Sequence, residues 1–271
     1  MKSLASTIVF TLFFWSISFA QHDTIFRFER SFDYPIESFT VNSLGELFLI
    51  NANNQLKKID EKGDSVGVFN MVTKYGKLSY VEAQNPWRTI LFYKNFSTVV
   101  LLDKFLNVLN NINLKKQNIF KVNAITSSYD NNLWLYDEQD YKLKKIDDDG
   151  SILFESFDMR RVLDSVPSPV QLLDADGFLY LYDPEKGFYT FDYYGALKNR
   201  LPFLHWKNFV VINKVLYGFD DHFFYTYPLN SFNLKQYPLP ASLADYTTVK
   251  IENNKIYVLK NGQLSIYAVA P

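Results

Sequence analysis

The chain has 271 residues, a formal net charge of −1, no cysteine and an aromatic content of 18%. A charge this close to zero argues against binding to nucleic acid or anionic lipid, and the missing thiols exclude disulfides, thiolate metal sites and a cysteine nucleophile. The 25 Phe and 19 Tyr residues favour β structure around a large core.

Residues 1–20 have the pattern of a signal peptide. Lys2 precedes an apolar run from Leu4 to Ile17, and Ser18-Phe19-Ala20 supplies small residues before a cleavage point at Gln21. The alternative is an uncleaved membrane anchor, since the run approaches the length that crosses a bilayer. The pattern predicts export to the periplasm or secretion, with residues 21–271 forming a single domain that has no membrane span after cleavage.

The mature part of the chain contains an internal repeat. In the first copy, residues 39–69, four short apolar segments are separated by turns, and the last two are joined by Asp60-Glu61-Lys62-Gly63. Residues 124–154 repeat this order almost position for position, with Asp147-Asp148-Asp149-Gly150 at the same place. Copies of this kind, with four strands each, are typical of propeller blades.

The spacing of one apolar position gives the number of copies. It recurs at intervals of 37 to 46 residues, at Leu47, Ile90, Leu133, Leu179, Leu216 and Ile256. We therefore predict an all-β fold, a six-bladed β-propeller of four-stranded blades with almost no helix. The last copy, residues 247–270, holds only three strands, so the early segment Thr24–Arg30 is expected to become its outer strand and close the ring. Innermost strands are expected at residues 39–42, 78–82, 123–127, 170–173, 209–212 and 248–251.

The alternating strands and Asp-x-x-Gly hairpins resemble the six-bladed propellers of the NHL and TolB-like kind. From about residue 24 to residue 270 the chain resembles exported bacterial propeller proteins. It is poorer in glycine than typical NHL repeats, and blades two and five lack the regular Asp-x-x-Gly turn. The resemblance implies a scaffold, and such scaffolds serve both enzymes and binding modules.

Metal and catalytic sites find little support in the sequence. The clusters Asp147-Asp148-Asp149-Gly150 and Asp174-Ala175-Asp176-Gly177 lack the spacing of a calcium loop and stand where hairpins need turns. The histidines are few and scattered, and the adjacent pair Asp221-His222 would point to opposite faces of a strand. No cofactor and no metal are therefore predicted. The plausible oxygen ligands on the innermost strands are Asn42, Glu82 and Asn123.

Departures from the repeat mark candidate binding residues. Blade two has Asn85, Trp87 and Arg88 where a small polar turn would suffice, and Trp and Arg are frequent anchors of interfaces. Packing of Trp87 against the next blade is an equal alternative. Trp206, in a connector after a proline, fits either role, whereas Trp134 lies within a strand and is assigned to the core.

We predict a noncatalytic exported scaffold that binds a protein partner of the bacterial envelope, or a ligand, through Asn85, Trp87, Arg88 and Trp206. A glycan or a small molecule is a further possible partner, because exposed Tyr and Trp stack on sugar rings. The alternative is a lactonase- or sugar-type hydrolase with a metal at the central channel. Carboxylates and amides converging on one channel mouth would favour the hydrolase, and an apolar aromatic face would favour the scaffold.

Overall fold

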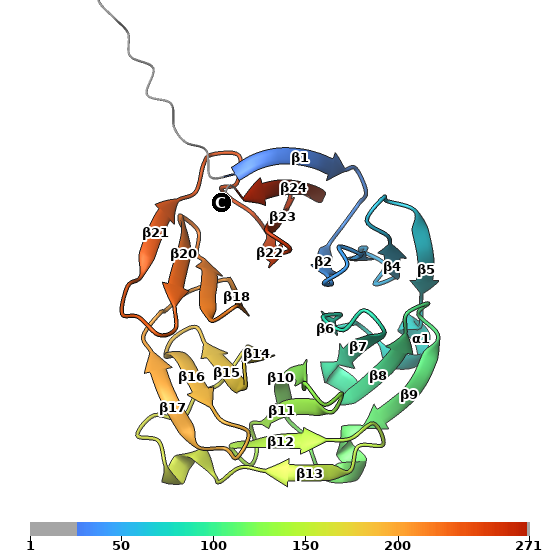
Figure 1. The fold of residues 1–271 in the computed structure, drawn as a ribbon. Coiled ribbons are helices and arrows are strands. Elements are labelled where there is room, and N and C mark those ends of the chain that lie inside the picture. The colour runs from blue at the N-terminus through green and yellow to red at the C-terminus, as the bar shows by residue number, and fades with distance from the viewer. Residues whose placement is uncertain (1–25, 270–271) are drawn as a thin grey trace, which may run out of the picture.

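The computed structural model describes residues 26–269. Six antiparallel sheets of four strands each are arranged in a ring around a central channel, as Figure 1 shows. The predicted all-β, six-bladed propeller is therefore confirmed. The predicted signal peptide, residues 1–20, lies outside the described residues.

In each blade the strands run in order from the channel to the rim. Blade one contains β2 (Ser38–Val41), β3 (Leu47–Ile50), β4 (Leu56–Ile59) and β5 (Ser65–Phe69). Blade two contains β6 (Tyr80–Glu82), β7 (Arg88–Tyr93), β8 (Thr98–Asp103) and β9 (Val108–Asn113). Blade three contains β10 (Val122–Ser127), β11 (Leu133–Asp137), β12 (Lys142–Ile146) and β13 (Ile152–Glu155). Blade four contains β14 (Gln171–Ala175), β15 (Phe178–Asp183), β16 (Gly187–Phe191) and β17 (Leu197–Leu201). Blade five contains β18 (Asn208–Ile212), β19 (Val215–Phe219), β20 (Phe223–Pro228) and β21 (Lys235–Pro238).

Blade six joins the two ends of the described chain. It consists of β22 (Thr248–Glu252), β23 (Lys255–Lys260), β24 (Gln263–Val269) and, outermost, β1 (Phe26–Phe32). β1 pairs antiparallel with β24, with Phe26 opposite Val269 and Phe32 opposite Leu264. The expected closure by the early segment is thus confirmed from Phe26 onward. A ring closed in this way leaves only short, outer edge strands.

The residues that defined the repeat occupy equivalent places in the core. All six lie on the second strand of their blades and are at most 1% exposed: Leu47, Ile90, Leu133, Leu179, Leu216 and Ile256. Burial of one such side chain stabilises the fold by about 1.5–3 kcal/mol. Core clusters extend across blade boundaries; one of them combines Phe48 of blade one with Leu91 of blade two. Neighbouring blades therefore stabilise one another, as a repeat architecture requires.

The two flat faces of the ring are built by different connections. The hairpin face carries the turns between first and second strands (residues 42–46, 83–87, 128–132, 176–177, 213–214, 253–254) and between third and fourth strands (60–64, 104–107, 147–151, 192–196, 229–234). The connector face carries the turns between second and third strands and the links between blades. Consecutive antiparallel strands alternate in direction, so these two sets of connections lie at opposite ends of the strands.

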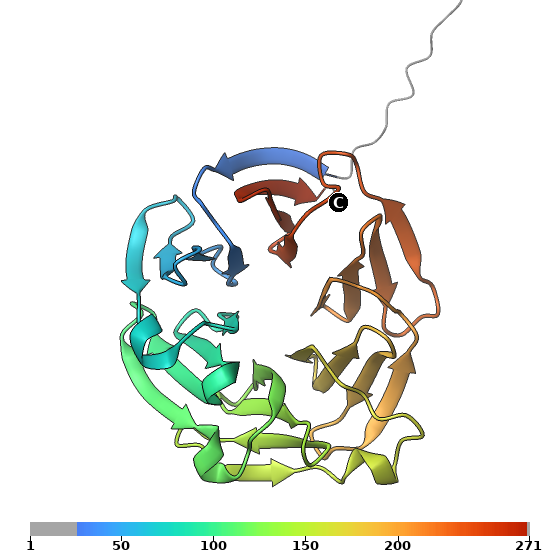
Figure 2. The ribbon, with the colours of Figure 1, turned by 180° about the vertical axis from the view of Figure 1, so that it is seen from behind.

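Helix in the described part of the chain is confined to short turns. They are α1 (Val72–Tyr75) and the 3-10 turns η1 (Lys94–Phe96), η2 (Leu114–Gln117) and η3 (Met159–Arg161). These turns lie on the connector face, which is turned to the viewer in Figure 2. Among residues 26–269 there is no helix with the length and apolar character needed to cross a bilayer.

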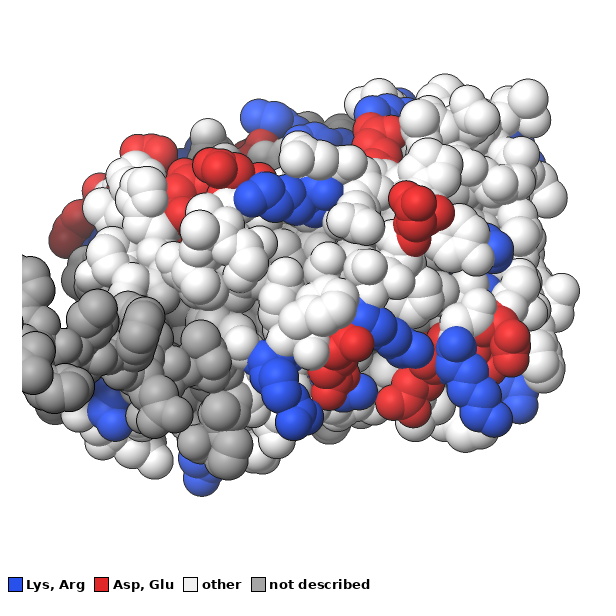
Figure 3. Space-filling view, turned by 90° about the horizontal axis from the view of Figure 1, so that it is seen from above, with Lys and Arg blue, Asp and Glu red and all other residues white. Residues whose placement is uncertain are grey.

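The rim nearest β1 carries a mixed charge. Figure 3 shows Lys and Arg side chains interspersed with Asp and Glu, without a continuous patch of either sign. This agrees with the formal net charge of −1 for the chain. On this side of the molecule, no extended field favours a polyanionic partner.

Candidate functional site

Turns of the hairpin face are capped by one recurring contact. The side-chain oxygen of an Asp at the end of the third strand accepts hydrogen bonds from the backbone N–H groups two and four residues later. The capping residues are Asp60, Asp103, Asp147 and Asp192. The predicted role of these aspartates as turn residues is therefore confirmed for Asp147.

Blade two keeps this turn without its glycine. In the turns of blades three and four, the third residue after the capping Asp is a glycine, Gly150 and Gly195, with φ of 87° and 78°. In blade two Leu106 takes that place with φ of 68°. The capping contact from Asp103 therefore maintains the turn even where the sequence pattern is broken.

The residue two positions after the cap points outward, and it is often apolar. Leu44 follows Asn42, Trp87 follows Asn85, Phe105 follows Asp103 and Tyr194 follows Asp192 in this way. Their exposed fractions are 57%, 67%, 57% and 85%. The same position holds Lys62 in blade one and Asp149 in blade three, so the turn itself needs no apolar side chain there.

The loop that carries Trp87 is anchored to blade three. The Asn85 side chain accepts from the Trp87 backbone N–H at 2.9 Å and donates to the Asn131 side chain at 3.1 Å. The Arg88 guanidinium forms an ion pair with Asp148 at 2.5 Å and donates to the Asn131 carbonyl oxygen. With its side chain only 11% exposed, Arg88 acts mainly as a link between blades, and it holds Trp87 in place.

Further aromatic side chains flank this loop. The ammonium group of Lys104 lies 4.9 Å from the centroids of both the Trp87 and the Phe105 rings. In blade three, exposed Tyr129 stacks on Tyr193 of blade four at 4.9 Å. We call the exposed side chains Trp87, Phe105, Tyr129 and Tyr194 the aromatic arc; it extends over blades two to four.

Trp206 and Trp134 are core residues. The Trp206 indole is 5% exposed and stacks between Phe203 and Tyr225 at 5.1 and 5.0 Å. This position supports packing in the core for Trp206, and not the predicted binding role. Trp134 is 1% exposed, which confirms its assignment to the core.

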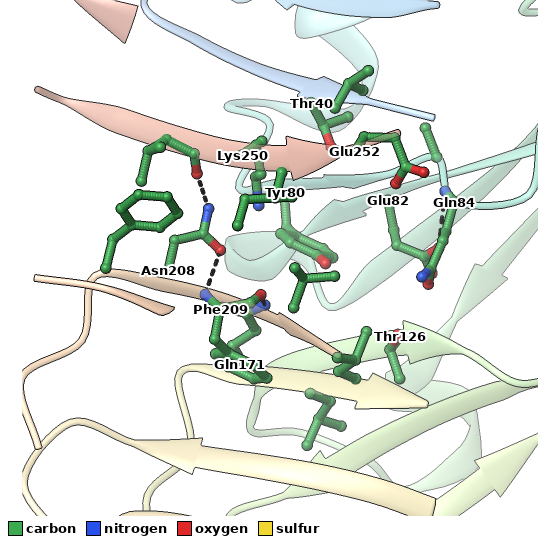
Figure 4. A pocket seen from close by; sticks show the side chains of 18 residues that line it. Thr40, Tyr80, Glu82, Gln84, Thr126, Gln171, Asn208, Phe209, Lys250 and Glu252 are labelled. Carbon is green, nitrogen blue, oxygen red and sulfur yellow. Dashed lines mark hydrogen bonds between the residues drawn. The ribbon is translucent and has the colours of Figure 1, made fainter. Parts of the chain in front are cut away.

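The innermost strands line a polar channel, shown from close by in Figure 4. They agree with the six expected segments to within a few residues. Of the three predicted oxygen ligands, Glu82 lines the pocket. Its carboxylate accepts from the backbone N–H groups of Ser127 and Gln84 and from the Ser127 hydroxyl, at 2.5, 3.3 and 2.7 Å. Burial raises the pKa of Glu82 although these donors oppose the shift.

Two further ionisable groups of β22 face the same channel. Burial alone lowers the pKa of the Lys250 ammonium from 10.5 to about 8. Burial also raises the pKa of Glu252, partly offset by a hydrogen bond from the Asn253 backbone. Neither residue forms an ion pair with another described residue. The channel therefore holds charges that the fold leaves uncompensated.

The other sequence candidates lie elsewhere. Asn42 caps its own turn and donates to Glu46 at 2.6 Å, whereas the Asn123 amide donates to Glu138 and lines a pocket on the connector side. His205 and His222 are exposed on the connector face, and His22 lies outside the described residues. Among residues 26–269 there is no group of three or more His, Cys, Asp or Glu side chains placed to hold a metal ion.

Comparison with known proteins identifies the fold. The sequence matches no protein-family model and no curated protein. Among solved structures, the chain is similar to virginiamycin B lyase from Staphylococcus aureus, with 15% identity, a TM-score of 0.62 and coverage of 88% of this chain and 83% of the lyase. It is also similar to BBS1N from a complex with ARL6DN, with 11% identity, a TM-score of 0.58 and coverage of 91% and 97%.

PorZ, a surface component of the type-IX secretion system of Porphyromonas gingivalis, has 14% identity and a TM-score of 0.57. The match covers 87% of this chain and 32% of PorZ. At such identities the similarities establish a shared propeller fold.

Sequence reasoning missed the channel lysine and most of the aromatic arc. Lys250 stands within an innermost strand that the sequence predicted, so strand alternation could have placed its side chain in the channel. Phe105 and Tyr194 follow recognisable capping aspartates by two positions. The fixed geometry of that turn is the signal that would have marked both as exposed.

Proposed function

We propose that this propeller is exported and binds a protein partner in the bacterial envelope through the aromatic arc of its hairpin face. We also propose that the propeller is of the NHL or TolB-like kind. Support for export comes from the signal-peptide pattern of residues 1–20. The partner is expected to cover the arc with apolar surface and to place a carboxylate near Lys104.

One observation carries the proposal. The Trp87 indole is 67% exposed, yet its loop is held by Asn85 and Arg88. A large aromatic side chain that is already ordered loses little conformational freedom on binding. The turns between third and fourth strands of blades one and three hold Lys62 and Asp149 where blades two and four hold Phe105 and Tyr194, so folding does not explain these two aromatic side chains. Trp and Tyr are frequent anchors of protein interfaces.

Two of the similar structures agree with such a role. PorZ is a component of a secretion system, and BBS1N was solved in complex with ARL6DN. Virginiamycin B lyase is an enzyme with a similar fold, although it is not named as a hydrolase. For this chain we favour binding over hydrolysis, because Glu82, the predicted channel ligand that lines the pocket, already accepts three hydrogen bonds from the protein.

The test is affinity purification after gentle cross-linking in the native envelope, using a C-terminally tagged chain. We expect a partner in stoichiometric amount, lost with Trp87→Ala and with the double variant Trp87→Ala/Tyr129→Ala. Phe157→Ala is the matched control, because this phenylalanine is also largely exposed, at 75% against 67% for Trp87, but lies on the connector face. N-terminal sequencing of the recovered protein should begin at Gln21.

A partner that survives the double variant, or that is lost equally with Phe157→Ala, would contradict the assignment of the arc. Binding to envelope polysaccharide that depends on Trp87 would replace the protein partner by a glycan. An N-terminus at Met1 in the membrane fraction would favour the uncleaved anchor.

A further inference from the structure

The channel widens into two cavities toward the connector face. One, of about 180 Å³, is lined by Lys250, by the hydroxyl-bearing side chains Thr40, Tyr80 and Thr248, and by Lys77 and Glu37, which form an ion pair with each other at 3.2 Å. The other, of about 320 Å³, is lined by Tyr80, Asn123, Gln171 and Lys94. Tyr80 belongs to both, and both continue into the central pocket. The connector face therefore offers a route to the middle of the ring.

Lys250 is the unpaired charge at the junction of these cavities. Its side chain lines both the central pocket and the smaller cavity, and in Figure 4 it points into the pocket beside Tyr80. Lys250 forms no ion pair with another described residue. This half-buried cation thus lacks the partner that charges shielded from water normally have, and a ligand of opposite charge would supply it.

Several of the groups around Lys250 are neutral hydrogen-bond donors. Burial raises the pKa of Tyr80 far above neutrality, so its hydroxyl remains a donor. The amide of Gln171 makes one long hydrogen bond, 3.4 Å to the carbonyl oxygen of Phe209, and the hydroxyl of Thr40 faces the same space. A cation surrounded by neutral donors has the composition of a site for an anion.

Carboxylates stand at the opposite end of the channel. Glu82 and Glu252 are the last residues of β6 and β22, next to the hairpin face, and Figure 4 shows them at one end of the pocket. Lys250 lies two residues before Glu252 on the same strand, so both side chains point to the same side of β22 and Lys250 is farther from the hairpin face. The ionisable groups that line the central pocket are thus Tyr80, Glu82, Lys250 and Glu252. An anion is attracted to the connector side and repelled at the hairpin end.

We propose that the channel binds a small organic monocarboxylate, which reaches Lys250 from the connector face and is held by its ammonium group and the Tyr80 hydroxyl. Among residues 26–269, Lys250 is the one Lys or Arg that lines the central pocket, and Lys77 of the smaller cavity is paired with Glu37, so the charge available at Lys250 matches one negative charge. A phosphate group carries about two charges and is usually held by several cations or a backbone nest. The cavity of about 180 Å³ is comparable to the roughly 150 Å³ that accommodates benzene. This site is independent of the aromatic arc.

The test measures binding to the purified chain by NMR of its lysine side chains labelled at Cε. The probes are acetate, butyrate and benzoate, with benzamide as a neutral analogue of benzoate. Benzoate is expected to shift the Lys250 resonance and to raise the pH at which it titrates, and Lys250→Met should weaken binding about tenfold or more. The matched control is Lys214→Met, which removes an exposed lysine of the hairpin face and should leave binding unchanged.

Loss of affinity in Lys250→Met cannot come from misfolding if the thermal unfolding temperature of the variant, which is measured alongside, is equal to or higher than that of the parent chain. The proposal is wrong if none of the carboxylates shifts the Lys250 resonance at tens of millimolar, or if benzamide binds as well as benzoate. It is also wrong if inorganic phosphate binds more tightly than the carboxylates, because the site would then be a phosphate site.

Discussion

The hairpin face and the connector face differ in the length of the segments that build them. Hairpin turns are short, and several are capped by an Asp or Asn that leaves one side chain pointing outward. The links between blades on the connector face are longer, for example residues 70–79 and 156–170, and their helical turns bury an anchor in the ring, as with Tyr75 of α1 and Met159 of η3. Short capped turns can present side chains to a partner surface, whereas buried connectors frame cavities. One ring therefore presents two kinds of surface.

Substitution of two tryptophans should show the largest difference in stability between the two faces. Trp206, on a connector, packs between aromatic rings, and Trp87, on a hairpin turn, is exposed. Trp206→Ala should lower the free energy of unfolding by about 3–5 kcal/mol, because it leaves a large cavity in the core of blade five. Trp87→Ala should change it by no more than about 0.5 kcal/mol. Urea denaturation of both variants makes the comparison.

The two variants serve as controls for each other, since both remove the same side chain. Equal losses of stability would mean that Trp87 packs against its neighbours in solution, which was the alternative interpretation of its sequence. Its exposed aromatic ring would then no longer support the proposed interface.

Substitution of Lys250 should have the next largest effect on the free energy of unfolding, and this effect should depend on pH. Its pKa of about 8 in the fold lies below its ordinary 10.5, so between these values the unfolded chain binds more protons and stability rises with pH. Below about pH 8 the full penalty is present, up to about 3 kcal/mol at 1.36 kcal/mol per unit. Lys250→Met should therefore be more stable than the parent chain below pH 8, and this advantage should vanish as pH approaches 10.5.

Denaturant unfolding on both sides of this window measures the effect. Buried tyrosines with raised pKa, such as Tyr180 at about 12, reduce stability above pH 10 in both proteins, so the comparison between them isolates Lys250. A constant difference across the window would show that Lys250 is not shielded from water, and would weaken the case for the channel site.

Arg88 gives a smaller effect that couples stability to binding. Arg88→Met removes the ion pair with Asp148 and the bond to Asn131. A loss of about 1–2 kcal/mol is expected, less than for a buried pair because Asp148 is half exposed. The affinity for the partner should fall although Trp87 is retained, because its loop is no longer anchored. The control is Arg27→Met, an exposed arginine of β1. Unchanged affinity would separate loop anchoring from recognition.

A large part of the fold could be predicted from the chain alone. The regular recurrence of buried apolar residues, from Leu47 to Ile256, predicted six blades, because each blade must bury the same second strand. The three-stranded last copy predicted that β1 would complete it. Asn85, Trp87 and Arg88 stood out as a departure from the repeat. The blades and the closure of the ring follow from local patterns that every copy must satisfy, and the loop was recognised because it departs from them.

What the sequence by itself determined was therefore the architecture and one exposed loop. The tertiary structure decided the rest: that Arg88 links blades while Trp87 is exposed, that Trp206 is buried, and that Lys250 faces the channel without a partner. These properties depend on residues far apart in the chain, as in the contact of Arg88 with Asp148, 60 positions later. A repeat pattern specifies each blade, but the neighbours of a side chain exist only after the ring has closed.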